Sequence, residues 1–255
     1  MQGCFDTSLA ALGSLPGKEK ETLYYVAFFN YSTGLERLLK VLLLLDSWHR
    51  NQKFLTNAEL KAYGHDIVEL HNKVNNMVKE YGAECKSELQ ADEVDNGILE
   101  FLSAFAEKSR YFNLGSLGGA HGLEDPLGVW YDLLRQIYEK DIPARLRLPD
   151  ADENEILVDH IEGNACRKLT REGATLQTET EGHLDERKMT LALPEMRWRL
   201  VKLLVPLKAL LIAIEVKIRA EAMGIDKEDA IPFLEEFLDF VCDERDRMAE
   251  SMVRP

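Results

Sequence analysis

Apolar residues recur at helical spacing along most of the chain, and this pattern predicts a bundle of helices. The clearest case is residues 20–50, where one long helix is expected. Its apolar stripe is so wide that the helix belongs at the centre of the bundle, in contact with neighbours on several sides. The stripe comprises Leu35, Leu38, Leu39, Val41, Leu42, Leu44, Leu45 and Trp48.

The same spacing predicts further helices downstream. They are expected from a start between Asn57 and Asp66 to Tyr81, then over residues 91–111, 126–140 and 194–223, with a last helix around 233–241. Gly82 is a typical helix stop, and the fourth helix should end before Pro143. Pro206 is expected to kink the helix that contains it, because its ring clashes with the carbonyl four residues back.

The pattern changes between residues 145 and 193. Acidic and polar residues dominate, with short alternating pieces at 168–171, 174–178 and 188–192, and Glu172-Gly173 could turn a hairpin between the first two. The segment is predicted to be a small, partly β insertion or a mobile arm; a disordered acidic linker is the alternative. The expected fold class is all-α, a helical bundle with a small partly β or irregular insertion. Three parts are expected: a core over 1–143, the polar insertion over 144–193, and a C-terminal helical pair over 194–255 that packs on the same core.

Composition narrows the functional classes. The 255 residues carry a net charge of −14, and an acidic surface repels phosphate backbones, so only a local basic patch could bind nucleic acid. The four cysteines, at 4, 85, 166 and 242, are scattered without a CxxC pair, which fits a reducing cytosol. Residues 1–15 lack the features of a secretory signal, and no apolar run is long enough to span a bilayer. The expected location is cytoplasmic, with no membrane partner.

Three short motifs follow one another within residues 20 to 140. They are Glu36-Arg37-Leu38-Leu39-Lys40, then Gly64-His65-Asp66-Ile67, then Arg110-Tyr111. In this order and rough spacing the chain resembles the HEPN superfamily of helical bundles, found in prokaryotic defence and toxin–antitoxin systems. The resemblance implies a HEPN-like bundle that forms a homodimer through its helices.

Active HEPN ribonucleases resemble one another in an Arg followed, four to six residues later, by a His. Their chemistry needs no metal, since the His moves protons and the Arg stabilises charge on the scissile phosphate. No His of this chain follows an Arg at that spacing: the gaps before His65, His121, His160 and His183 are all ten residues or more. The missing motif favours a non-catalytic member of the superfamily.

The motifs also supply the candidate ligand-binding residues. Lys40 and Arg110 would offer positive charge to an RNA or nucleotide phosphate, and Tyr111 a stacking surface. Simpler roles remain open: Glu36 and Lys40 can form an ion pair one helical turn apart, and Asp66 beside His65 can cap a helix. The full candidate set is Glu36, Lys40, His65, Asp66, Arg110 and Tyr111.

Cofactor and metal signals are weak. His65 and Glu69 share a helix face without a third ligand, so no metal site is predicted. The glycine-rich segment 115–122 lacks the Gly-Lys-Ser/Thr ending of a phosphate-binding loop and is expected to be a connector. No cofactor is predicted.

Two functions follow from these residues. The first is a non-catalytic binding or regulatory component of a defence or toxin–antitoxin system, whose partner is a nucleotidyltransferase, a toxin, or an RNA or nucleotide bound at a local site. The alternative is a metal-independent endoribonuclease in which His65 and Arg110 meet in space without the sequence motif.

Overall fold

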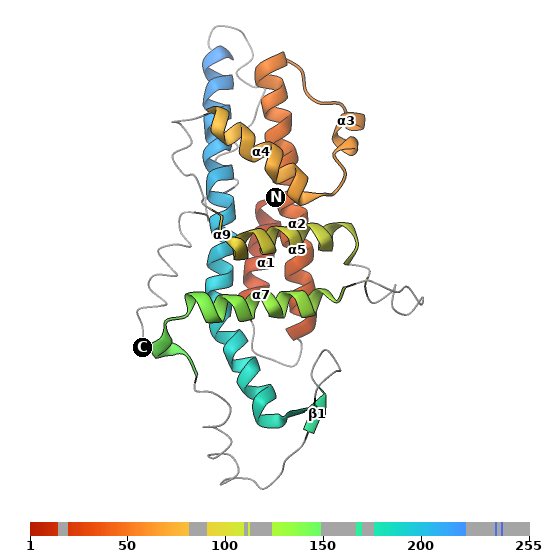
Figure 1. Cartoon of the computed structure of the whole chain (residues 1–255). Coiled ribbons are helices and arrows are strands. Elements are labelled where there is room, and N and C mark those ends of the chain that lie inside the picture. Colours follow the sequence, from red (N-terminus) through yellow and green to blue (C-terminus); the bar gives the residue numbers. More distant parts are fainter. Residues whose placement is uncertain are drawn as a thin grey trace.

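Two long helices form the frame of the molecule. The computed structural model describes residues 1–14, 20–81, 91–109, 112, 124–148, 167–169, 176–222, 238 and 241. Helices α2 (Lys20–Asn51) and α9 (Glu179–Ala222) run side by side along the long axis, and α1 (Gln2–Gly13) packs against both (Figure 1). The predicted all-α class is confirmed. No helix among these residues is long and apolar enough to cross a membrane.

Three shorter helices lie across this frame. They are α4 (Ile67–Tyr81), α5 (Glu93–Glu107) and α7 (Pro126–Asp141), with α5 packed between the other two (Figure 1). A six-residue helix, α3 (Asn57–Ala62), precedes α4, and a 3-10 turn, η3 (Ala144–Leu146), follows α7. As expected from the sequence, α7 ends before Pro143.

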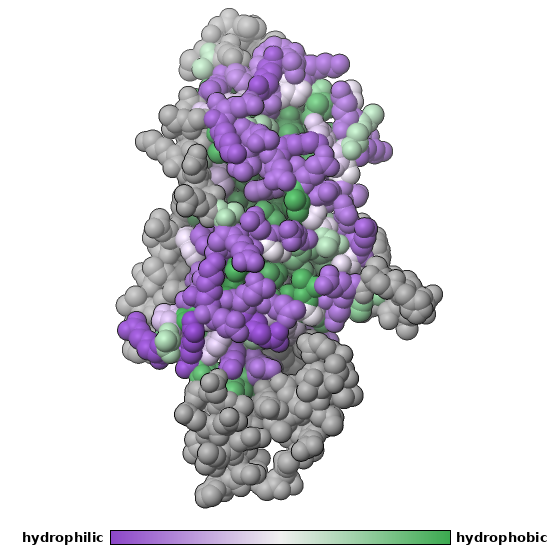
Figure 2. Space-filling view, in the orientation of Figure 1, coloured by the Kyte–Doolittle hydropathy of each residue, from purple (hydrophilic) through white to green (hydrophobic). Residues whose placement is uncertain are grey.

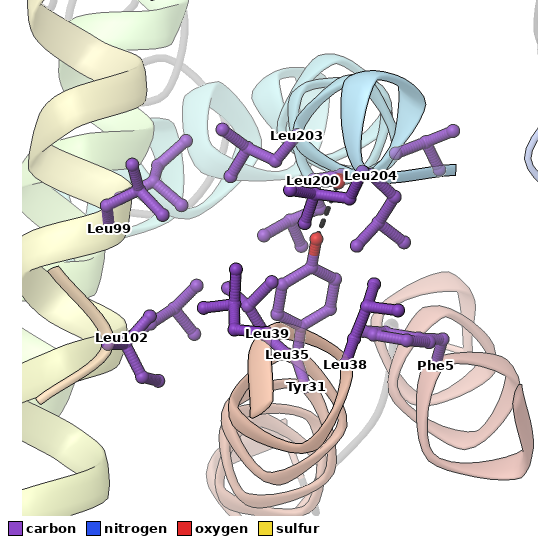
Figure 3. Close-up of a cluster of buried hydrophobic side chains, with 14 of the residues drawn as sticks. Phe5, Tyr31, Leu35, Leu38, Leu39, Leu99, Leu102, Leu200, Leu203 and Leu204 are labelled. Carbon is purple, nitrogen blue, oxygen red and sulfur yellow. Dashed lines mark hydrogen bonds between the residues drawn. The ribbon is translucent and has the colours of Figure 1, made fainter. Parts of the chain in front are cut away.

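Most of the predicted core stripes are buried, but Val41, Leu44 and Trp48 of the α2 stripe are only partly buried. Helix α2 contributes fully buried leucines at 35, 38, 39 and 42. The apolar residues at helical spacing on α4 are also buried: Ile67, Leu70, Val74, Met77, Val78 and Tyr81. Tyr31 of α2 also enters this core, where its hydroxyl donates a 2.6 Å hydrogen bond to the Leu200 carbonyl of α9 (Figure 3). Burial raises the pKa of Tyr31 well above its usual value, so the phenol stays protonated and holds the two long helices together.

The start of α9 corrects the sequence prediction. The helix begins at Glu179, not at Pro194, and continues through both Pro194 and Pro206. The alternating piece predicted at 188–192 is therefore wrong as β structure, and the predicted boundary between residues 193 and 194 falls inside α9. The reason is visible in the burial pattern, since the inward residues are spaced as on a helix: Met189, Ala192, Leu193 and Met196.

A short hairpin and the first helix complete the description. Strands β1 (Arg167–Leu169) and β2 (Leu176–Thr178) pair antiparallel, with Leu169 opposite Leu176, and overlap the segments predicted as strands at 168–171 and 174–178. The turn predicted at Glu172-Gly173 lies outside the described residues. Helix α1 was not expected from the sequence, although Phe5, Leu9 and Leu12 give it a buried face.

Candidate functional site

Glu36 and Lys40 form the centre of the predicted polar site. Both project from α2, whose neighbouring positions 35, 38 and 39 are fully buried. Lys40 Nζ lies 2.8 Å from Glu36 Oε1, so the one-turn ion pair expected from the sequence is present. The side chain of Glu36 is 17% exposed and that of Lys40 is 19% exposed. The ion pair is therefore half-buried and does not lie on the open surface of α2.

The loop before α4 closes over this pair. Lys40 Nζ donates a second hydrogen bond, of 2.7 Å, to the carbonyl of Gly64. His65 Nδ1 lies 3.1 Å from each carboxylate oxygen of Glu36. Gly64 has a φ of +63°, a left-handed conformation that favours glycine, and this turn brings its carbonyl and the His65 ring toward α2.

Asp66 stabilises the start of α4. Its Oδ1 accepts hydrogen bonds from the Glu69 amide at 2.9 Å and from the Ser103 hydroxyl of α5 at 3.1 Å. The Ser103 oxygen in turn accepts from the Ile67 amide at 2.9 Å. Asp66 is therefore the N-cap of α4, and Ser103 shares that task from a neighbouring helix. Sequence reasoning missed Ser103, because a single serine within a helical stretch carries no signal of its own.

The carboxylates of the site outnumber its ammonium groups. Glu36 and Asp66 supply two carboxylates, and Lys40 supplies one ammonium, which bonds Glu36. Burial alone would raise the pKa of Glu36, but hydrogen bonds from Lys40 and His65 hold it below its usual value. Glu36 therefore stays ionised, and both of its described partners are donors. His65, with 57% of its side chain exposed, is the most accessible member.

The structure brings together four of the six candidate residues: Glu36, Lys40, His65 and Asp66. Arg110 and Tyr111 lie outside the described residues, so their place relative to this group stays a prediction. Around the site, Lys73 of α4 lies over the Tyr63 ring, 4.7 Å from its centroid, and pairs with Glu69. Glu69 is thus engaged by a lysine instead of joining His65.

A second polar cluster was not foreseen from the sequence. The Arg199 guanidinium of α9, 4% exposed, binds three carboxylates: Asp95 at 2.6 Å, Asp92 at 2.9 Å and Asp141 at 2.7 Å. Lys140 adds a 2.7 Å bond to Asp92. We call Arg199 and these three aspartates the arginine clamp. It ties the start of α5 and the end of α7 to α9, and the four residues come from segments too far apart in sequence to suggest a pairing.

Neither cluster suggests a resident metal. Within the described ranges, no group of three or more His, Cys, Asp or Glu side chains is arranged to hold a metal ion. Comparison with known proteins gives no relative: no protein-family model matches the chain, and no curated protein or solved structure is similar to it.

Proposed function

We propose that this chain is a non-catalytic, HEPN-like binding protein from a prokaryotic defence or toxin–antitoxin system, and that its partner is a protein. The observation that carries the proposal is the pairing within the site. Lys40, the cation expected to meet a phosphate, already bonds to Glu36 and to the Gly64 carbonyl. Binding an anion there would require breaking a half-buried ion pair, which costs more than its exposed equivalent.

The charge of the whole chain supports a protein partner over RNA. A net charge of −14 opposes the approach of a phosphate backbone, whereas it attracts a partner with a basic surface. The face of the molecule in Figure 2 is largely hydrophilic, with small hydrophobic patches between polar side chains. Such a surface fits an association steered by charge, and a toxin or nucleotidyltransferase with a basic nucleic-acid groove is a partner of this kind.

The test is binding to the product of the adjacent gene, where that gene encodes a nucleotidyltransferase or a toxin. Calorimetry with the purified pair should give a complex that Glu36→Gln and His65→Gln weaken about tenfold or more, the effect of losing one charged contact. Arg135→Gln is the matched control, because Arg135 forms an exposed ion pair with Asp132 on α7. Absence of binding, or tighter binding to single-stranded RNA than to the protein, would overturn the proposal.

A ribonuclease is the second candidate, and one observation favours it. Glu36 holds His65 through Nδ1, and no described residue forms a hydrogen bond to its Nε2. A carboxylate on Nδ1 favours the tautomer with a basic Nε2, the arrangement of a general base. RNA cleavage by the purified protein in EDTA, lost in His65→Ala and Arg110→Ala, would support it. No cleavage, or cleavage that survives both substitutions, would exclude it.

The resemblance also leads us to propose a homodimer. Large exposed apolar side chains occur on α2, the loop after it, η3 and α9: Phe29, Phe54, Leu146, Leu191 and Val216. Light scattering should give twice the chain mass at micromolar concentration, and a monomer there would contradict the proposal.

A further inference from the structure

The segment that links α2 to α4 stands apart from the bundle. Residues 52–65, here called the strap, leave the end of α2, form α3 and return beside the middle of α2 (Figure 1). Helix α3 buries none of its residues. The helix is stabilised locally by a capping box, in which the side chains of Thr56 and Glu59 each accept a hydrogen bond from the other's backbone amide. Leu55 and Tyr63 of the strap pack partly against the core, whereas α3 between them relies on its own hydrogen bonds.

Both ends of the strap turn through unusual backbone conformations. Among the described residues, positive φ angles occur at Gln52, with 51°, and at Gly64, with 63°. Left-handed φ is costly for a residue with a side chain, so the chain at Gln52 is held there by its surroundings. These two residues bracket α3 and are natural points for the strap to turn about.

Contacts fasten the strap at its two ends. At the α2 end, the Ser47 hydroxyl donates to the Lys53 carbonyl at 2.9 Å, and Trp48 stacks on Phe54 with ring centroids 4.6 Å apart. At the α4 end the contacts come from Lys40 and Glu36, which bond Gly64 and His65, while Tyr63 packs partly against the core. The hydrogen bonds that fasten that end thus come from the candidate binding residues, and Lys73 of α4 adds a contact with the Tyr63 ring, 4.7 Å from its centroid.

We propose that the strap is a hinged cover of the candidate site, latched by the bonds of Lys40 and Glu36 to residues 64 and 65. Opening the latch uncovers the half-buried ammonium and carboxylate for a partner's polar groups, and closing it returns them to Gly64 and His65. This regulatory role rests on the binding function proposed above. It predicts that the strap opens as a local unit while the bundle stays folded, as exposed segments with few buried contacts do.

Amide hydrogen exchange of the full-length protein, without any partner, tests the latch. In the unmodified chain the hydrogen-bonded amides of the strap, such as those of Glu59, Leu60 and Gly64, should be protected, but less than those of the α2 core and α5. Lys40→Met keeps the aliphatic stem and removes the bond to Gly64, so exchange in the strap should rise about tenfold with α5 unchanged. Arg135→Met, which removes an exposed ion pair on α7, should change neither region.

A pair of glycine variants tests the hinge. An added Cβ meets nothing within 4 Å at Gly64 or at Gly3, but only Gly64 has a positive φ. Gly64→Ala should therefore speed exchange in the strap several-fold, while Gly3→Ala in α1 should not.

Three results would overturn the proposal: no protection of the hydrogen-bonded amides of the strap in the unmodified chain, no change in Lys40→Met, or faster exchange in the strap and α5 together. Because no partner takes part, a failed binding experiment with an intact exchange result would remove the proposed function and leave the hinge standing.

Discussion

The arginine clamp and the Glu36–Lys40–His65 site are both polar clusters within an apolar bundle, but they differ in how far their side chains are exposed to solvent. Arg199 is almost completely buried, and its guanidinium meets three carboxylates from two other helices. Lys40 meets one carboxylate and one backbone carbonyl, and the group is completed by a histidine that is more than half exposed.

This difference fits a structural role for the arginine clamp and the binding role proposed for the Glu36–Lys40–His65 site. The guanidinium at the centre of the clamp is buried, although Asp92 is 34% exposed, so it can lose its partners only when the helices around it separate. Each buried charge left behind would then be unpaired. In the Glu36–Lys40–His65 site, Lys40 bonds a loop carbonyl and Glu36 bonds an exposed imidazole. Both partners can be exchanged for others without disturbing the core. The clamp is therefore expected to govern stability, and the site to govern recognition.

The largest effect is expected from breaking the clamp. Arg199→Met has similar bulk but leaves Asp92, Asp95 and Asp141 without their shared cation, which should cost about 3–5 kcal/mol of unfolding free energy. Urea denaturation followed by circular dichroism would measure this. Arg135→Met, at an exposed pair on α7, should stay within about 0.5 kcal/mol of the unmodified chain. A loss at Arg199 as small as that would show that the clamp contributes little.

The two clusters also differ in how far the sequence predicted them. Helix positions and buried faces of α2, α4, α5 and α7 follow from hydrophobic spacing, which needs only local information. Glu36, Lys40, His65 and Asp66 were found because short motifs contain them. The clamp was missed since Arg199 and Asp92 lie far apart in sequence, and their pairing depends on how α5, α7 and α9 cross. The start of α9 was misplaced because Pro194 is typical of a first helical turn, while tertiary burial of Met189 and Leu193 extends the helix beyond it.

Acid should weaken the clamp by a smaller amount, because a protonated carboxyl can still accept a hydrogen bond. Burial alone would raise the pKa of Asp92, but hydrogen bonds from Arg199 and Lys140 hold it well below its usual range. A carboxyl with a lowered folded pKa stabilises the protein above its unfolded pKa of about 4, and that contribution is lost as the pH falls further. Denaturation curves between pH 6 and about pH 3 should show the loss. Asp92→Asn should flatten it, and an unchanged slope would contradict this assignment.

Ser103→Ala should have an intermediate effect that separates the fold of the site from its recognition. The Ser103 hydroxyl accepts a hydrogen bond from the Ile67 amide and donates one to Asp66 at the start of α4. Its removal therefore leaves a buried amide without that acceptor. The expected cost is about 1–2 kcal/mol. Ser32→Ala, at a buried serine of α2 whose hydroxyl bonds only the nearby Phe29 carbonyl at 3.3 Å, is the control and should cost less. Equal losses at the two serines would argue against a special role of Ser103 at the helix start.

The smallest effect is expected at Glu195, which lies on α9 near the clamp and faces an excess of carboxylates. Burial, with the neighbouring Asp141 carboxylate, raises the pKa of Glu195, although Lys202 and Arg199 act in the opposite direction. A group with a raised folded pKa stabilises the protein most below its unfolded pKa, and this contribution is lost as the pH rises through the folded pKa. Glu195→Gln should therefore raise the unfolding free energy at pH 7 by less than about 1 kcal/mol, with a smaller gain near pH 4. Glu139→Gln on the exposed side of α7 should change neither value. If Glu195→Gln instead destabilises the protein at pH 7, the carboxylate belongs to the clamp and helps to neutralise Arg199.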